Sequence, residues 1–250
     1  MQKHLLLLLS FFIAFIGRSQ NVEDLIKQAD LLEKQMKETE AYSKFKDALK
    51  IQPQHLYALI HCSELASRIG RVQITKEKQV DFYKAAKIYA ERALRVNPKD
   101  SDANMVMAVA YGRLSLMQSG KEKIAFVKEI KNFAEKSVAI NAKNFKALHV
   151  LGKWHYEVSN LNPVEKTALK MFYGGLPKAS FDSSLYFYQT AGTLSPTFIL
   201  NFLEMAKVYQ KLKQKEKALE YLRYAIKLPD ATSEDVLIKN EAKELLKKWK

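Results

Sequence analysis

The sequence predicts an all-α protein: a superhelix of about five helix–turn–helix units, with one short inserted helix and a C-terminal capping helix. Three observations support this prediction. Ala, Leu, Lys and Glu are abundant among the 250 residues, which include only eight glycines and six prolines, and the abundant side chains lose little rotamer freedom in a helix. Stretches that end helices recur along the chain, and the apolar residues between them follow a helical period.

The recurring stretches mark the end of the second helix in each unit. Each places a small and an apolar residue near a polar residue or a proline, and proline cannot continue a helix. The five stretches are ALKIQP (48–53), ALRVNP (93–98), SVAINA (137–142), AGTLSP (191–196) and AIKLPD (225–230). They divide the chain after residue 20 into units at about 22–53, 56–98, 101–142, 145–196 and 199–230, followed by a cap at 233–249.

Within the units, small residues recur where two helices must cross closely. Ala41 and Ala48 hold such places in the first unit, and Leu151 and Gly152 hold a Leu-Gly place in the fourth. This pattern resembles the tetratricopeptide repeat (TPR), a helical hairpin of about 34 residues. We therefore expect Gly152 to lie at a helix crossing.

The spacing between helix ends is longer than a standard repeat requires. Pro53 and Pro98 are 45 residues apart, and Pro98 and Ala142 are 44 apart, so we expect longer helices in the second and third units. Ala142 and Pro196 are 54 apart, which leaves room for an insertion at 161–180.

The insertion carries its own helix signals. Asn162 is a suitable N-cap, Pro163 suits the first helical position, and Glu165 stands three residues after the cap. Gly174 and Gly175 then stop the segment. We expect a short extra helix between the two helices of the fourth unit.

The final segment predicts a capping helix that covers the exposed end of the core. It begins at a Ser or Asp cap and places four apolar residues roughly on one face: Val236, Ala242, Leu245 and Leu246.

The N-terminus has the features of a secretory signal. A 12-residue apolar run, Leu5 to Ile16, is shorter than the roughly 20 residues of a spanning helix, and small residues follow it. We expect residues 1–19 to be a signal peptide, cleaved near Ser19–Gln20, and the protein to be periplasmic or secreted. The alternative is a membrane anchor formed by uncleaved residues 5–16.

Cys62 is the only cysteine, and its apolar neighbours predict a buried, unreactive thiol.

Three stretches carry a more specific resemblance: LHVLGKWHYEVSNLNPVEK, YGGLPKASFDSSLYFYQTAGTLSP, and the segment from Leu203 to Lys248 that begins LEMAKVYQKLKQKEKALEYL. Together they resemble the regulator of microtubule dynamics family over about residues 85–249. The resemblance implies an all-helical, non-enzymatic protein with interaction functions and, for eukaryotic members, an association with microtubules.

The residues offer no pattern for catalysis, a metal or a cofactor. His55 and His61 are six residues apart, as are His149 and His155, so neither pair shares a helix face. No phosphate-binding glycine loop or nucleophile motif occurs.

Two pairs of acids stand at turns or helix starts, Glu38 with Glu40 and Glu234 with Asp235. We interpret them as caps and solvated charges. The lysine runs at 211–217 and 244–250 predict solvated surface in place of a nucleic-acid interface.

The remaining candidate is a concave groove lined by the first helix of each unit. In the TPR pattern, positions 2, 5, 9, 12 and 13 of a unit point inward. The candidate groove residues at these positions are Arg68, Arg113, Lys146, His149, Lys153, Tyr156, Lys207, Gln210 and Lys211. The chain has a formal net charge of +14. Together with the cations of the candidate groove, this charge predicts a protein or acidic peptide as ligand. Two alternatives are an ordinary solvated face, and a carrier of a lipid or other anionic amphiphile held in the groove under the insertion at 161–180.

Overall fold

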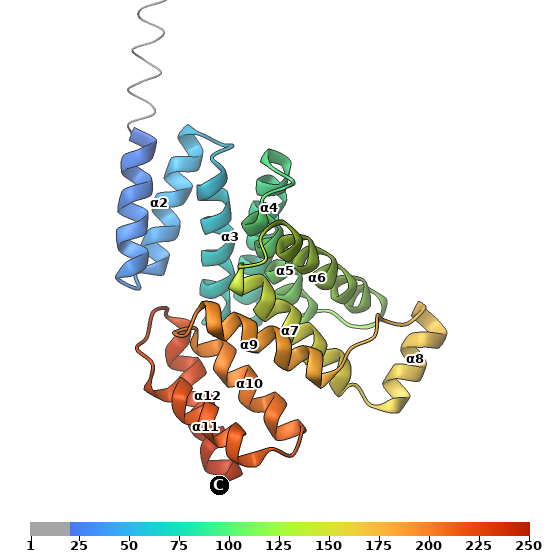
Figure 1. Cartoon of the computed structure of the whole chain (residues 1–250). Coiled ribbons are helices and arrows are strands. Elements are labelled where there is room, and N and C mark those ends of the chain that lie inside the picture. Colours follow the sequence, from blue (N-terminus) through green and yellow to red (C-terminus); the bar gives the residue numbers. More distant parts are fainter. Residues whose placement is uncertain (1–20) are drawn as a thin grey trace, which may run out of the picture.

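The computed structural model describes residues 21–250, and across this range the chain is helical without a strand (Figure 1). The expected signal peptide, residues 1–19, lies outside the described residues, so export stays a prediction. No helix in the described range combines the length and the apolar character that a bilayer crossing requires.

A helical segment over 21–34 is followed by eleven labelled helices in the described range. They are α2 (Glu38–Ile51), α3 (Leu56–Arg71), α4 (Lys76–Val96), α5 (Ser101–Ser115), α6 (Gly120–Ile140), α7 (Phe145–Asn160), α8 (Pro163–Tyr173), α9 (Phe181–Leu194), α10 (Ile199–Lys211), α11 (Lys215–Lys227) and α12 (Glu234–Trp249).

Consecutive helices pack as antiparallel hairpins, which confirms the predicted fold class. The segment 21–34 precedes α2, α3 packs on α4, α5 on α6, α7 on α9, and α10 on α11, while α12 covers the last hairpin. Helices α4 and α6 have 21 residues each, against 14 in α2. Their extra turns account for the long spacing of the second and third units.

The recurring helix ends have a common geometry. Gln52, Asn97, Asn141 and Ser195 each leave the helical conformation and donate their backbone N–H to the carbonyl four residues earlier. The polar residue therefore closes the last turn, and the following proline, where present, prevents a further one.

Gly152 lies at a close crossing, as predicted. A Cβ added to Gly152 would lie 2.7 Å from the ring of Tyr188 on α9. On the same side, the Ser184 hydroxyl donates a hydrogen bond of 2.7 Å to the Gly152 carbonyl. The register of the α7–α9 hairpin is thus fixed by a residue that has no side chain.

The predicted inserted helix is α8. Asn162 and Glu165 form a reciprocal capping box, Pro163 opens the helix, and Gly174 (φ 70°) and Gly175 (φ 76°) end it in the left-handed conformation. The helix lies beside α6, where the Lys128 ammonium donates a 3.1 Å hydrogen bond to the Tyr173 carbonyl.

The face of the capping helix differs from the prediction at one position. Ile238 and Ala242 are buried on α12, with Leu245 and Leu246 packed beside them, whereas Val236 is exposed. The prediction for Val236 was wrong because the α12 residues buried in its first turn are charged ones, Glu234 and Asp235. Cys62 is fully buried, which confirms the predicted burial, and burial raises the pKa of its thiol to about 12.

Candidate functional site: the inner face

The first helices of the units face one another across the inside of the superhelix. We call this surface the inner face and define it by the charged side chains that bridge the segment 21–34, α3, α5, α7, α10 and α12. Several bridges join helices that are far apart in the chain, such as Lys146 on α7 with Glu64 on α3. Such bridges require the superhelix to curve tightly on this side.

Arg68 and His61 on α3 share the Glu33 carboxylate of the segment 21–34. Arg68 pairs with one Glu33 oxygen and His61 Nδ1 lies 2.9 Å from the other. Arg68 also lies 3.3 Å from Glu38 at the start of α2. Burial would raise the pKa of Glu33, but the hydrogen bonds and charges of His61 and Arg68 outweigh it and lower the pKa to about 2.

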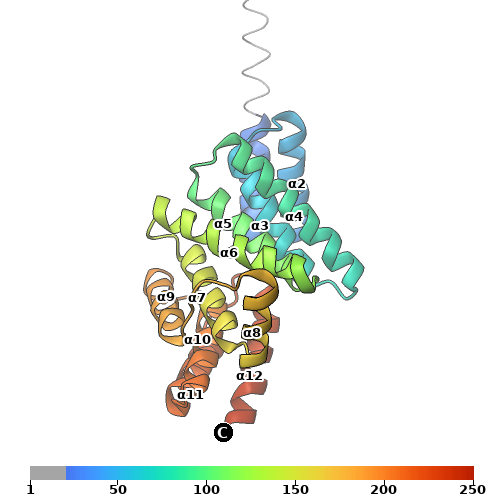
Figure 2. The same cartoon turned by 90° about the vertical axis from the view of Figure 1, so that its right-hand side faces the viewer.

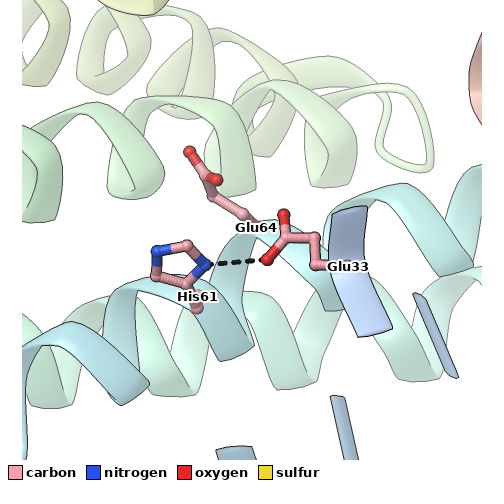
Figure 3. Close-up of side chains that lie close together, drawn as sticks. All are labelled: Glu33, His61 and Glu64. Atoms are coloured by element: carbon pink, nitrogen blue, oxygen red, sulfur yellow. Dashed lines mark hydrogen bonds and ion pairs between the residues drawn. The ribbon is translucent and has the colours of Figure 1, made fainter. Parts of the chain in front are cut away.

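Glu33, His61 and Glu64 also form a compact trio (Figure 3). Their potential ligand atoms lie within 4.8 Å of one another. Each carboxylate, however, already holds a cation: Arg68 pairs with Glu33, and Lys146 with Glu64. Because a divalent ion would have to displace both cations, we assign the trio to the ion-pair network.

At the other end of the inner face, Glu204 on α10 binds two lysines. Lys153 on α7 lies 2.8 Å from one oxygen of this buried carboxylate, and Lys207 lies 2.9 Å from the other. Burial would raise the pKa of Glu204, but the two ammonium groups lower it to about 2. Burial would likewise lower the pKa of Lys153, whereas the charges of Glu204 and Glu157 raise it above its usual range.

The C-terminal helix closes the inner face against the first half of the chain. The carboxylate of Glu234, the first residue of α12, lies 3.0 Å from Arg71 on α3 and 2.9 Å from Arg113 on α5. Beside it, the Ser233 hydroxyl donates to Glu38. The interpretation of Glu38 and Glu234 as solvated charges was therefore wrong: both begin helices, as predicted, but both are buried partners of arginines from other units.

Of the remaining candidates, His149 and Tyr156 pack on the same face, and Gln210 and Lys211 do not join its ion pairs. His149 is buried, with Nδ1 3.1 Å from the Asn201 side-chain oxygen, and burial lowers its pKa to about 4. Tyr156 is buried against Phe181, and the Lys153 ammonium lies 5.5 Å from its ring centre. Gln210 is half-buried, and its side-chain oxygen has no hydrogen-bond partner within residues 21–250. Lys211 is exposed, and no acid among those residues pairs with it.

The structure thus brings seven of the nine predicted residues into one face. All five cations among the seven are neutralised by acids that the prediction did not include: Arg68, Arg113, Lys146, Lys153 and Lys207. The sequence held part of the signal, because Glu33 and Glu64 occupy positions 12 and 9 of their units, which are themselves inward positions. Glu204 and Glu234 fall outside that template.

The inserted helix does not cover this face. Its described contacts are with α6, through Lys128 and through Gly120, whose added Cβ would lie 4.0 Å from the Tyr173 hydroxyl, and with the end of α7, where the Lys166 ammonium donates a 3.1 Å hydrogen bond to the Ser159 carbonyl. None of the described hydrogen bonds or ion pairs of residues 161–180 reaches an inner-face residue.

Comparison with known proteins agrees with both the fold and the sequence resemblance. The model of the family described as regulator of microtubule dynamics protein 1-3 matches residues 25–250. Regulator of microtubule dynamics protein 1 from Pongo abelii is 28% identical over 240 residues, covering 93% of this chain and 74% of that protein. The Caenorhabditis elegans protein of the same name is 31% identical over 160 residues, covering 64% and 71%.

Among solved structures, a thermophilic TPR protein from Thermus thermophilus superposes with a TM-score of 0.65 at 14% identity, covering 90% of this chain and 98% of that one. At this identity the likeness concerns the fold alone. The chain has the TPR-like fold, and it belongs to the regulator of microtubule dynamics protein family.

Proposed function

We propose that this protein is a non-enzymatic scaffold whose inner face binds an acidic segment of a protein partner. The observation that carries the proposal is the placement of Lys146 and Lys153 on α7. Each rests on a carboxylate beneath it, yet their side chains remain 42% and 39% exposed. An ammonium group has three donors, so Lys146 can bind a ligand carboxylate while it holds Glu64.

The composition and the family support the same class of ligand. A net charge of +14 favours association with anionic partners. The relatives are named for the regulation of microtubule dynamics, and we take from them a protein partner in place of a small substrate. If the native protein is exported, as its N-terminus predicts, that partner is an extracytoplasmic protein and not a microtubule component.

The ion pair between Lys153 and the buried Glu204 makes charge reversal of Lys153 an ambiguous test. Reversing the charge of Lys153 would place a glutamate beside the buried Glu204, so lost binding could reflect damage to the inner face. Neutralising a whole pair avoids this problem. In the double variant Lys146→Gln with Glu64→Gln, the groove loses a cation and no buried acid is left unpaired.

The measurement is fluorescence anisotropy with a labelled peptide of alternating Asp and Glu, and with a lysine-rich peptide as the charge control. We expect the acidic peptide to bind, to weaken roughly tenfold in the double variant, and to dissociate as salt screens the charges. The matched control neutralises the Lys131–Glu135 pair on α6, away from the inner face, and should bind as the wild type does. Equal binding of both peptides, or an unaffected double variant, would reject the inner face as the site.

A further inference from the structure

None of the side chains of helix α8 is fully buried. Its large apolar residues instead point to solvent: Val164 is 78% exposed, Met171 73% and Phe172 72%. Together with the half-buried Ala168 they stand at spacings of four, seven and eight residues, which places them on one face of the helix. We call these four residues the α8 stripe.

The stripe is held in place by a well-terminated helix. The capping box at Asn162 and Glu165 begins α8, and the left-handed Gly174 ends it. On the opposite side, the half-buried Leu169 and Tyr173 turn toward the body of the protein, where Lys128 holds the Tyr173 carbonyl. The helix is thus fixed in an orientation that exposes its apolar side.

The position of α8 suits a surface that approaches from outside. Figure 1 shows α8 projecting beyond α6 and α7 at the edge of the molecule, and Figure 2, seen from that side, shows it in front of them. At 11 residues, or about 16 Å of helix, α8 is too short to cross a bilayer and can only lie on one.

The charge around α8 selects the kind of surface. Its own sequence, the linker after it and the adjoining start of α6 carry six exposed lysines: Lys121, Lys123, Lys128, Lys166, Lys170 and Lys178. Only two exposed glutamates, Glu122 and Glu165, accompany them. None of the six lysines forms an ion pair with an acid in the described part of the chain, unlike those of the inner face.

A lipid surface fits these features better than a folded partner. A stable protein interface buries roughly 800 Å² on each side, far more than a stripe of three large side chains supplies. An interfacial helix, in contrast, needs only an apolar face and lysines that attract anionic headgroups.

We propose that α8 docks the protein on an anionic membrane surface. The α8 stripe enters the boundary between headgroups and acyl chains, while the surrounding lysines contact lipid phosphates. This inference concerns a face remote from the inner face and stands independently of the proposed peptide binding.

The experiment places a fluorescent reporter on the stripe of the full chain. Phe172→Cys is labelled with the environment-sensitive dye nitrobenzoxadiazole, since the native Cys62 is fully buried and shielded from the reagent. The matched control carries the dye at Tyr186→Cys, an exposed position on α9 (63%). Each protein is titrated with vesicles of mixed phosphatidylglycerol and phosphatidylcholine, and with vesicles of phosphatidylcholine alone.

We expect the emission of the dye at position 172, and not at 186, to shift to the blue and brighten with the anionic vesicles. Neutral vesicles should require about tenfold more lipid, or more, for the same change. Adding Val164→Ser and Met171→Ser to the labelled chain should weaken the response about tenfold or more. Because the two positions share one N-terminus, membrane attachment through residues 5–16 alone would leave both dyes unchanged or shift them equally. Either of those results, or equal responses to the two lipids, overturns the proposal.

Discussion

The inner face and helix α8 use similar side chains in opposite ways. On the inner face, arginines and lysines of one unit meet carboxylates of another, and the acids at the centre of each cluster are buried. On α8, lysines and large apolar residues remain exposed and contribute nothing to the core. A charged residue at an inward position of a repeat thus first indicates an ion pair that holds the units together. An exposed apolar stripe without a structural role is stronger evidence of a binding surface than such a charge is.

Acid should break the inner face while leaving α8 unaffected. Glu33 and Glu204 have a pKa of about 2 in the folded protein, against an ordinary value of 4.5. A carboxylate with a lowered folded pKa stabilises the fold above its unfolded pKa, and this stability is lost as the pH falls from about 4.5 toward 2. Each contributes up to roughly 3 kcal/mol.

His149 adds an earlier loss in the same direction. Burial holds its pKa at about 4, below the ordinary 6.5, so the unfolded chain binds the proton more tightly and stability declines from about pH 6.5 to 4. Urea unfolding measured from pH 7 to 3 should show both phases. His149→Gln should flatten the first, and Glu33→Gln with Glu204→Gln the second. Unaltered slopes in these variants would assign the acid sensitivity to other groups.

Removing the arginines that hold α12 should have the next largest effect. Arg71→Met with Arg113→Met leaves the buried Glu234 carboxylate without a cation, and breaking such a pair from one side costs about 3–5 kcal/mol. The control is Arg223→Met on α11, an exposed arginine with no ion pair among residues 21–250.

Restoring neutrality separates charge from packing in this variant. Glu234→Gln, added to the two arginine substitutions, should recover most of the lost stability in urea unfolding. If the triple variant is as unstable as the double one, the arginines act through their packing and the closure of the inner face is not electrostatic.

The fold was predictable because it repeats. Helix ends such as 93–98, the small residue at Gly152 and the capping signals around Asn162 are local, and each produced the expected element. The ion pairs of the inner face are not local. Arg113 and Glu234 are 121 positions apart, and they meet only because small rotations between units accumulate along the superhelix.

The acids of the inner face were partly within reach of the sequence. Glu33 and Glu64 occupy the same inward positions that singled out the cations, so applying the template to both signs of charge would have predicted a balanced face. The exposure of the α8 stripe was not within reach, because a short apolar run predicts burial as readily as exposure. Only the placement of α8 beside α6 distinguishes the two.

The smallest of the predicted effects tests the helix that presents Lys146 and Lys153. Helix α7 is positioned by the contact of Gly152 with Tyr188, where an added Cβ would lie 2.7 Å from the ring. Gly152→Ala should therefore overpack the hairpin and lower the free energy of unfolding by about 1–3 kcal/mol. Gly112 on α5 is also a glycine inside a first helix, yet an added Cβ there would meet nothing within 4 Å. Gly112→Ala should raise stability by about 0.5–1 kcal/mol, because alanine loses less backbone entropy in a helix.

Urea unfolding of the two variants should thus give changes in the free energy of unfolding of opposite sign. If both are stabilised, Tyr188 moves aside at little cost, and the crossing of α7 and α9 is set by the Ser184 hydrogen bond in place of the missing side chain.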